Sequence, residues 1–373
     1  MMKIELLQDN LKAALAVAGR VAKEKTTLPV LANLLLKTDG GGLQIAACDL
    51  TTSITVRVSG KVEEEGAITL NAKRLGEVVG LMPVERMNIF SDDKKLEATV
   101  KGSKSRTSIK GLDAGEFPII PTLAHAQVLF TVLASDLLKA FKAVSFSMAT
   151  DTTAPSLNAT YLSLSGPCLT FATTDRFRLS EYKMRVKYEG DDHAMLIPFD
   201  GVGHIERVLA KLAESAAEVQ VAIAERNNQI IIGNEDLQVG VQLVDGKFFD
   251  YAQVIPKKFT TKITASIADL ALAVRQVGVV VEDGRGIKVD FKTDDAVVTG
   301  QSTERGDDSD ASVSIALDGD PKAVELNHRY LLPVLSALDA VQCSIQMTPG
   351  KSPIIVRGEE DKGVQLWEMN SKL

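Results

Sequence analysis

Apolar residues follow helical spacing in the middle of the chain. Leu137, Phe141 and Val144 recur at i, i+4 and i+7, which places them on one face of a helix. Asp136 precedes the first of these residues and is of a type that favours helix starts. An extended apolar run, residues 128–132, leads into this stretch. The pattern predicts a strand followed by an amphipathic helix.

The same strand–helix pattern occurs twice more. Near the N-terminus, the run 4–7 precedes a helical pattern that starts at Leu11 and extends to about Lys23. After residue 260, the run 263–267 precedes a pattern that starts at Leu270. The three copies lie roughly 130 residues apart, which is an ordinary domain size, and they predict three homologous domains.

A second helical pattern also has three copies. Apolar residues occupy the same positions in the segments 75–82, 205–212 and 331–338, after the extended runs 67–70, 194–197 and 323–326. Four residues before the first apolar position of each helix lies a candidate N-cap: Asn71, Gly201 and Asn327. Pro333 falls inside the third of these helices, where a proline is expected to bend the helix or delay its start.

These repeats predict an α+β protein in which each domain packs two helices on antiparallel sheets. We expect domains at residues 1–122, 127–256 and 257–373, and the Pro and Gly content of residues 111–121 suggests a linker near residues 118–126. Pro29 is expected to end helical structure, and the apolar run after it is expected to form a buried strand.

Composition places the chain among ordinary soluble proteins. Of its 373 residues, 45% are hydrophobic and 24% are charged, and no apolar run is long enough to span a bilayer. The N-terminus lacks the hydrophobic region of a signal peptide. Cys48, Cys168 and Cys343 are far apart and lack the spacing of a metal or redox motif. These features predict a cytoplasmic protein that does not associate with membranes.

The net charge of −7 argues mildly against a protein coated in nucleic acid. Basic residues nevertheless recur on the polar sides of the predicted helices. On the first type of helix they are Lys12, Arg20, Lys23, Lys139, Lys142 and Arg275, and on the second type Lys73, Arg74, Arg207, Lys211 and Arg329. Their repetition favours a shared basic surface. For any single helix, the alternative is that lysine and arginine only solvate an exposed face.

A search for catalytic motifs finds almost nothing. The chain lacks the nucleophile elbow, the zinc-protease helix motif, the phosphate-binding loop and the dinucleotide fingerprint. The acidic stretch 307–310 lacks the glycine and the terminal glutamate of a calcium loop, so a solvated turn is the better interpretation. We therefore expect no enzymatic activity, no metal and no cofactor. The protein is expected to act through its shape and by binding other molecules.

Three segments carry a family resemblance. Residues 27–36 (TLPVLANLLL), 174–179 (TDRFRL) and 244–251 (VDGKFFDY) resemble signature segments of the bacterial sliding clamp family, the beta subunits of the replicative DNA polymerase III holoenzyme. Residues 105–118 and 146–148 fit as well, so the resemblance covers essentially the whole chain in order.

The resemblance implies the DNA clamp fold and a head-to-tail homodimer that closes into a ring around duplex DNA. It also implies a role for the basic helix residues. They would attract DNA phosphates without contacting the bases, so that the ring can slide along the duplex. Lys25, Lys73 and Arg74 match DNA-contacting positions of the family, and Lys25 joins the eleven basic residues named above as DNA-binding candidates. Phe199 and Asp200 replace residues that are usually basic.

The resemblance also implies an apolar pocket that binds short linear peptides of DNA polymerase, the clamp loader and repair factors. The matching positions are Leu157, Thr174, Arg176, Phe177, Arg178, Leu179, Phe249, Val254, Tyr330 and Leu366. Arg176 stands where the family usually has glycine, Phe177 where histidine is common and Phe249 where proline is common. The C-terminal residues depart further from the family pattern. The alternative is that these apolar residues only form the core of a domain junction.

The resemblance places the dimer interface between domain one of one chain and domain three of the other. Ile109 and Val279 match apolar interface positions, while Thr107 replaces a common aromatic residue. The leading hypothesis is thus a non-enzymatic DNA sliding clamp, a replication processivity factor. The alternatives are a non-ring scaffold that uses the same fold to bind peptides, and a hydrolase with dispersed acidic residues.

Overall fold

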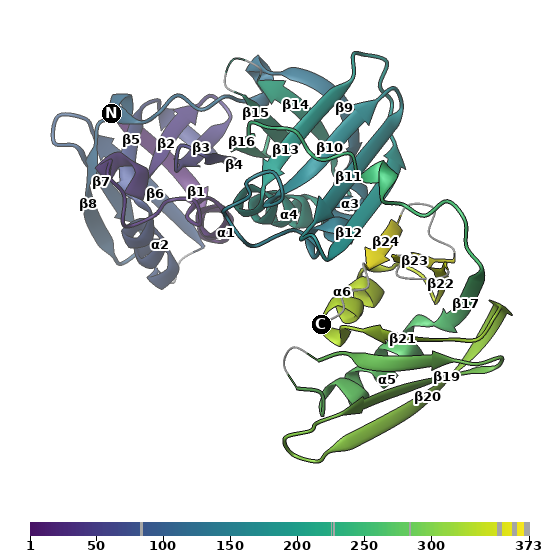
Figure 1. Cartoon of the computed structure of the whole chain (residues 1–373). Helices are drawn as coiled ribbons and strands as arrows, with labels where there is room; N and C mark the ends of the chain where they lie inside the picture. The colour runs from purple at the N-terminus through teal and green to yellow at the C-terminus, as the bar shows by residue number, and fades with distance from the viewer. Residues whose placement is uncertain are drawn as a thin grey trace. The chain divides into compact units, whose positions relative to one another are not determined.

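The computed structural model describes residues 1–82, 85–224, 226, 228–282, 285–348 and 353–359, and the backbone alone of residues 364–368. By its internal contacts the chain divides into two compact units (Figure 1). The first contains residues 1–138 and 200–243, and the second contains residues 139–199 and 244–373. No helix in the described part of the chain combines the length and apolarity needed to cross a bilayer.

The first unit contains one continuous twelve-stranded sheet. In sheet order its strands are β1 (Met2–Leu7), β6 (Arg86–Asp92), β7 (Glu97–Lys101), β8 (Arg106–Leu112), β5 (Ala67–Asn71), β2 (Asn33–Asp39), β3 (Gly42–Cys48), β4 (Thr52–Glu64), β16 (Leu237–Gln242), β15 (Gln229–Gly233), β14 (Glu218–Ala224) and β9 (Gln127–Leu133). β1 also pairs with β4, so the first eight strands close on themselves.

The second unit contains another twelve-stranded sheet. Its order is β13 (His193–Pro198), β10 (Ala159–Ser165), β11 (Cys168–Thr174), β12 (Arg178–Arg185), β24 (Val364–Glu368), β23 (Ile354–Gly358), β22 (Gln342–Met347), β17 (Thr261–Ser266), β20 (Asp308–Gly319), β19 (Asp295–Gln301), β18 (Ile287–Phe291) and β21 (Lys322–Leu326). Every pairing in both sheets is antiparallel, as the hairpin patterns predict.

Strand pairing repeats with a period of eight strands. β1 pairs with β6 in the first copy, β9 with β14 in the second, and β17 with β22 in the third. The hairpins β2–β3, β10–β11 and β18–β19 are equivalent in the same way. β16 continues onto β4, and β24 continues onto β12, so each sheet runs from one copy into the next. The predicted threefold repeat is confirmed.

Six α-helices are found in the described residues, two for each copy of the repeat. They are α1 (Gln8–Ala18), α2 (Ala72–Leu81), α3 (Ala134–Ser145), α4 (Phe199–Ala213), α5 (Ile267–Gly278) and α6 (His328–Ala337). The predicted caps Asn71 and Asn327 begin α2 and α6: their side chains accept hydrogen bonds from Arg74 N at 3.1 Å and Arg329 N at 2.9 Å. These bonds satisfy backbone donors that a helix start leaves free.

Two local predictions need correction, and a third is excluded only in part, because bending at Pro333 stays a prediction. Gly201 is not a cap, because α4 already begins at Phe199; a Cβ on Gly201 would lie 2.3 Å from Val241 Cγ1, so close packing requires the glycine. Pro29 does not end helical structure but starts a short 3-10 helix, Pro29–Ala32, before β2, since proline fits the first helical turn. The helix with Pro333 starts without delay after Asn327.

The apolar helix faces form the core. Leu11, Leu15 and Ala18 of α1 are buried in the first unit. In the second unit, Phe141 of α3 is fully buried, and its ring meets that of Phe171 of β11 edge-on with centroids 5.1 Å apart. The apolar spacing that predicted these helices therefore also predicted which of their residues are buried.

Asp49, in the turn after β3, is held by several donors. Its side chain accepts from Thr51 N, Thr51 Oγ1 and Thr52 N at 2.7–3.1 Å, and Lys23 Nζ lies 2.8 Å from Oδ2. Burial alone would raise the pKa of Asp49, but the hydrogen bonds from Lys23, Thr51 and Thr52 outweigh it and hold the pKa below its usual 3.8.

Replacing Asp49 with asparagine is therefore expected to lower the free energy of unfolding by about 1–3 kcal/mol at pH 7. A carboxyl whose pKa is depressed by folding stabilises the protein above its unfolded pKa, and this contribution disappears as the pH falls through the folded pKa. The difference between wild type and variant should thus shrink below about pH 4, in urea unfolding at pH 7 and pH 3. Glu65→Gln, on an exposed site, is the control; an equal loss at both pH values would contradict the assignment.

Candidate binding pocket and basic helix residues

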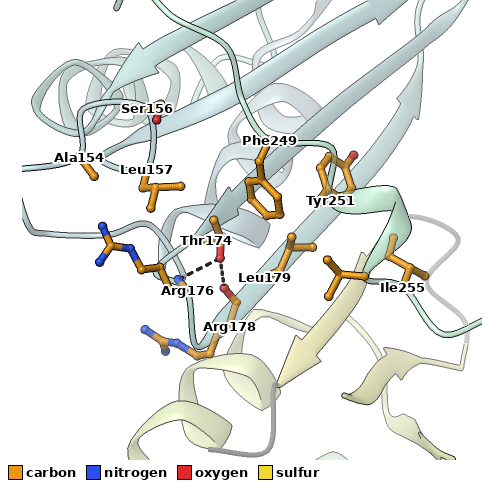
Figure 2. Close-up of a pocket in the computed structure, with 11 residues that line it drawn as sticks. Ala154, Ser156, Leu157, Thr174, Arg176, Arg178, Leu179, Phe249, Tyr251 and Ile255 are labelled. Carbon is orange, nitrogen blue, oxygen red and sulfur yellow. Dashed lines mark hydrogen bonds between the residues drawn. The ribbon is translucent and has the colours of Figure 1, made fainter. Parts of the chain in front are cut away.

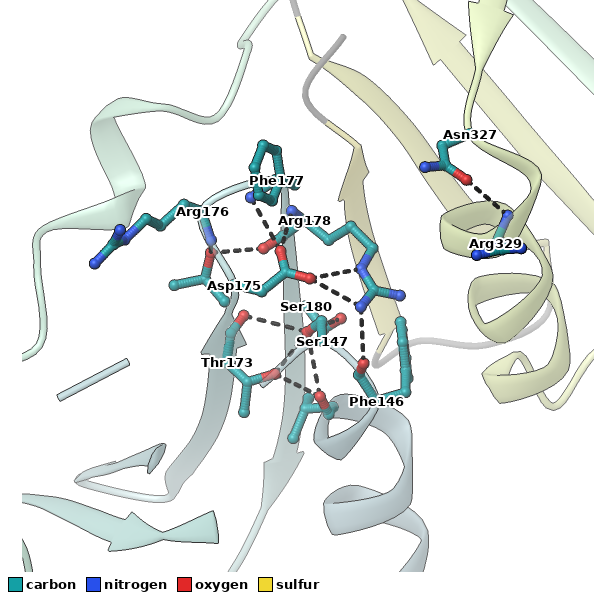
Figure 3. Close-up of polar contacts among 12 residues, drawn as sticks. Phe146, Ser147, Thr173, Asp175, Arg176, Phe177, Arg178, Ser180, Asn327 and Arg329 are labelled. Atoms are coloured by element: carbon teal, nitrogen blue, oxygen red, sulfur yellow. Dashed lines mark hydrogen bonds and ion pairs between the residues drawn. The ribbon is translucent and has the colours of Figure 1, made fainter. Parts of the chain in front are cut away.

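The turn between β11 and β12 forms the rim of an apolar pocket. Thr174 Oγ1 accepts from Arg176 N at 3.1 Å and donates to Arg178 O at 2.6 Å. Asp175 Oδ1 accepts from Phe177 N at 3.0 Å and from Arg178 N at 2.7 Å (Figure 3). These side-chain bonds add to the backbone bond from Asp175 N to Arg178 O, at 3.3 Å, and fix the shape of the turn.

Arg178 is immobilised by this turn and its surroundings. Its Nε and Nη2 lie 3.0 and 2.8 Å from Asp175 Oδ2, and Nη2 also donates to Phe146 O at 3.2 Å. The guanidinium lies 5.8 Å from the ring centroid of Phe146 and 4.6 Å from that of Tyr330, both within cation–π range. Only 12% of the side chain is exposed, so its charge is already compensated inside the protein.

A buried hydroxyl cluster supports the turn from below. Ser147 Oγ lies 2.6 Å from Thr173 Oγ1 and 2.6 Å from Ser180 Oγ, and Thr173 Oγ1 also donates to Val144 O (Figure 3). Ser147, Thr173 and Ser180 are fully buried. Because the hydroxyls satisfy one another, the ends of β11 and α3 stay joined without an exposed polar group.

The pocket itself has a volume of about 420 Å³ and mostly apolar walls (Figure 2). Its lining residues are Ala154, Ser156, Leu157, Thr174, Arg176, Arg178, Leu179, Phe249, Tyr251, Val254 and Ile255. The floor is continuous with a small core in which Leu179 packs on Ile355. A concave apolar site of this size with a few polar groups is typical of ligand binding.

Seven of the ten predicted pocket residues line this cavity: Leu157, Thr174, Arg176, Arg178, Leu179, Phe249 and Val254. Phe177 and Tyr330 lie beside it, stacked on each other with centroids 5.9 Å apart. Leu366 is on β24, and its side chain lies outside the described residues. The structure thus brings most of the predicted set together, while its role in binding stays a prediction.

The sequence analysis missed Ala154, Ser156, Tyr251 and Ile255. Nearness in sequence was the available signal, because Ala154 and Ser156 precede Leu157 in one loop, while Tyr251 and Ile255 flank Val254. Chain proximity alone does not say which side chains turn into a cavity.

Tyr251 is fixed by a buried carboxylate. Its hydroxyl donates to Glu181 Oε2 at 2.6 Å, and Lys183 Nζ lies 2.8 Å from Glu181 Oε1. Only 3% of the Glu181 side chain is exposed. Burial, together with the hydrogen bond to Glu181, raises the pKa of Tyr251, so the phenol remains a donor. This bond ties the segment after β16 to β12 and sets one wall of the pocket.

Neighbouring aromatic rings hold the same segment. Phe248 stacks flat on Tyr161 of β10, with centroids 5.0 Å apart. Phe249 lies 5.1 Å from Phe248 and 6.3 Å from Tyr251, between centroids. Phe249 is 41% exposed, and its ring forms an open wall of the pocket.

Eleven of the twelve predicted DNA-binding residues are exposed, and Lys139 is half-buried. α1 ends at Ala18, so Arg20 and Lys23 lie in the segment after the helix rather than on it, which corrects the predicted extent. Several lysines form ion pairs: Lys23 with Asp49 at 2.8 Å, Lys73 with Glu24 at 3.0 Å, Lys139 with Asp339 at 3.1 Å and Lys211 with Glu214 at 2.6 Å.

His204 of α4 lies among these charges in the first unit. Burial and the neighbouring Arg207 hold the pKa of His204 below its usual value. Its Nδ1 lies 3.1 Å from Arg207 Nη1, a distance at which the neutral ring can accept a hydrogen bond. Within the described residues, no cluster of three or more metal-binding side chains is present.

The two predicted interface residues differ in exposure. Val279, at the end of α5, is 83% exposed, whereas Ile109 of β8 is only 5% exposed. Ile109 therefore offers little side-chain surface to a partner, and its place at an interface stays a prediction.

Solved structures with this architecture are DNA clamps. The chain superposes on a sliding clamp from Pseudomonas aeruginosa bound to griselimycin, with a TM-score of 0.92, 24% identity and full coverage of both chains. It matches a clamp from Bacillus subtilis with a TM-score of 0.92 and 19% identity, over 100% of this chain and 99% of the other. The fold is thus the DNA clamp fold.

The family follows from three models that match in order. They describe the N-terminal, central and C-terminal domains of the DNA polymerase III beta subunit, at residues 2–121, 131–250 and 252–372. The chain belongs to the DNA polymerase III beta subunit family. Relatives named beta sliding clamp include one from Synechococcus elongatus, 26% identical over 95% of both chains, and one from Pseudomonas putida, 27% identical over 99% of this chain and all of the other.

Proposed function

We propose that this protein is a non-enzymatic sliding clamp that encircles duplex DNA and tethers DNA polymerase and other partners. The observation that carries the proposal is the match of three consecutive beta-subunit domains across almost the entire chain. Full-length relatives that carry the name beta sliding clamp agree with it. A clamp of this kind acts in the cytoplasm, where bacterial DNA is replicated.

Holding DNA by topology changes what the basic residues must do. A closed ring cannot dissociate sideways, so its contacts with the duplex can stay weak and free of sequence preference. Exposed Lys12, Lys142 and Arg275 can attract phosphates without reading bases, and such contacts are equivalent at every step along the duplex. A protein with a net negative charge can therefore slide along DNA if its basic residues face the central hole of the ring.

Ring closure requires two copies of the chain. β8 pairs with β7 at residues 106–110, and with β5 only at Gly111 and Leu112. Among the described residues, the other edge of residues 106–110 has no strand beside it, and such an edge is a template for pairing with a second chain. We place the dimer interface at β8 of domain one and at domain three, near Val279, of the partner copy. We also propose that the three domains meet near residues 122–127 and 256–257.

The pocket provides the tether. An apolar cavity of about 420 Å³ with an aromatic wall fits two or three apolar side chains of a short peptide. Because the pocket does not depend on the basic helix residues, DNA holding and partner binding are separate properties of the protein.

The test is retention on circular DNA. Protein loaded on a nicked circular plasmid by its clamp loader and ATP should stay with the plasmid through a gel-filtration wash at high salt. Cutting the circle with a restriction enzyme should release nearly all of it, because the protein can then slide off the ends. Equal retention on circular and cut DNA, or no retention on either, would contradict the ring and favour a non-ring scaffold.

A matched pair of variants separates electrostatic attraction from topology. Reversing the charge of Lys12, Arg20 and Lys142 to glutamate should reduce loading, since the duplex then meets repulsion. Reversing Lys37, Lys61 and Lys187, which are exposed residues outside the helices, changes the net charge equally and should have little effect. The same loss in both variants would argue against a basic helix surface.

A further inference from the structure

Arg176 has an uncommon backbone conformation. Its φ angle is +77°, in the left-handed region that glycine adopts freely and other residues reach at a cost of about 1 kcal/mol or more. The turn would form more easily with glycine at this position. The backbone therefore gives no reason for an arginine here.

The side chain of Arg176 is not needed to build the turn either. The stabilising bonds use its backbone N–H, the Thr174 hydroxyl and the Asp175 carboxylate. Figure 2 shows the Arg176 side chain extending from the turn toward the loop that carries Ala154 and Leu157. It lies at the rim of the apolar pocket and is exposed.

Among the described residues its guanidinium is also held in no ion pair, in contrast to that of Arg178. Within the described part of the chain, no carboxylate lies in ion-pair distance of the Arg176 guanidinium, whereas Arg178 is bound by Asp175. Arg176 contributes to the lowered pKa of Asp151, but the main cause is hydrogen bonding by Thr153, which donates from Oγ1 at 2.6 Å and from N at 2.9 Å. Asp151 already has these local donors.

From these observations we propose that Arg176 is a specificity-determining residue that selects peptides with an acidic side chain next to their apolar anchor. The other polar lining residues are Ser156, Thr174 and Tyr251, which are uncharged, and Arg178, which Asp175 holds. Among the described lining residues, Arg176 is therefore the one cation that is free to pair with a ligand. A planar guanidinium with several donors suits a carboxylate. The inference rests on the proposed peptide-binding function and names the class of peptide that the pocket prefers.

The expected preference is moderate and depends on salt. A partly exposed ion pair beside an apolar wall should strengthen binding of an acidic peptide about three- to tenfold over its amide counterpart. Screening should reduce that ratio as the ionic strength rises. The apolar contribution of the peptide should persist at high salt.

Arg176→Gly is the most informative variant because its backbone suits the turn. It should fold at least as well as wild type while losing the charge. Arg176→Gln removes the charge but keeps a polar side chain and the strained left-handed backbone. Arg176→Lys keeps the positive charge. Arg185→Gln, an exposed arginine at the far end of β12, is the control for loss of a positive charge elsewhere.

The experiment is selection of a displayed library of random dodecapeptides on the full-length wild-type protein and on each variant. Peptides recovered on wild type, Arg176→Lys and Arg185→Gln should be richer in aspartate and glutamate than those recovered on Arg176→Gly and Arg176→Gln. Selected acidic peptides are then compared with their Asn or Gln counterparts by fluorescence anisotropy. The three- to tenfold ratio should disappear in Arg176→Gly.

Three results would overturn the inference, and they are distinguishable. If the wild type enriches apolar peptides without an acidic preference, the peptide pocket stands and the role of Arg176 falls. If no peptide is enriched above a Phe249→Ala, Val254→Ala double variant, the proposed peptide-binding function falls with it. If Arg176→Gly changes retention on circular DNA but not peptide selection, the arginine serves DNA instead.

Discussion

Replacing Phe249 with alanine should weaken peptide binding about thirtyfold. Its ring forms an exposed aromatic wall of the pocket and is positioned by contacts with Phe248 and Tyr251. Aromatic residues at the centre of an interface are typical hot spots, whose truncation costs 2 kcal/mol or more, and about 1.4 kcal/mol corresponds to a factor of ten. Fluorescence anisotropy with a peptide selected on the wild-type protein measures the loss directly.

The control is Leu272→Ala. Leu272 lies on α5, is 54% exposed and does not line the pocket, so its truncation removes a similar apolar surface elsewhere. We expect unchanged peptide affinity and unchanged loading for Leu272→Ala. Phe249→Ala should be loaded less efficiently, because the clamp loader is proposed to use the same pocket, but the molecules that are loaded should stay on circular DNA as long as wild type. If Phe249→Ala binds peptide as tightly as wild type, the cavity is not the binding site.

Replacing Phe141 with alanine should lower the free energy of unfolding by about 3–5 kcal/mol. The side chain is fully buried on α3, and its edge-on contact with Phe171 adds to the area it removes from water. Truncation leaves a cavity between α3 and β11 that neighbouring residues fill only in part. Urea unfolding measures the effect, and hydrogen–deuterium exchange in α3 assigns it to this part of the chain.

Two substitutions on the same helix calibrate this result. Lys142→Ala changes an exposed residue next to Phe141 and should alter stability by less than about 0.5 kcal/mol. Phe141→Leu keeps an apolar side chain and should have an intermediate effect. A loss for Phe141→Ala no larger than that for Lys142→Ala would mean that the α3–β11 contact does not contribute as described.

The sequence predicted the helices well because their signals are local. Leu137, Phe141 and Val144 repeat within two turns, and Asn71 and Asn327 cap helices through bonds that span only two or three residues. The threefold recurrence then added a constraint that no single helix pattern contains. Hairpin turns predicted that some neighbouring strands pair, such as β2 with β3, but not pairings such as that of β1 with β6.

Features that depend on distant residues were beyond sequence reasoning. The tight contact that requires Gly201 involves Val241, forty residues later, and the bond from Tyr251 reaches Glu181, seventy residues earlier. The left-handed backbone of Arg176 was hidden because arginine gives no sign of it. The family resemblance located the pocket. Which residues form its walls and which of them carries an available charge could be assigned only from the structure.

The ion pairs of Lys23, Lys73 and Lys211 bear on how the protein would travel. Each ammonium group already has a carboxylate of its own chain at 2.6–3.0 Å, so a phosphate must displace that carboxylate to be bound. The exchange replaces one anion with another, and its net free energy is small. If these three lysines face the duplex, as we propose, none of them would hold one phosphate tightly, and their contribution to the barrier between successive positions along the duplex would be small.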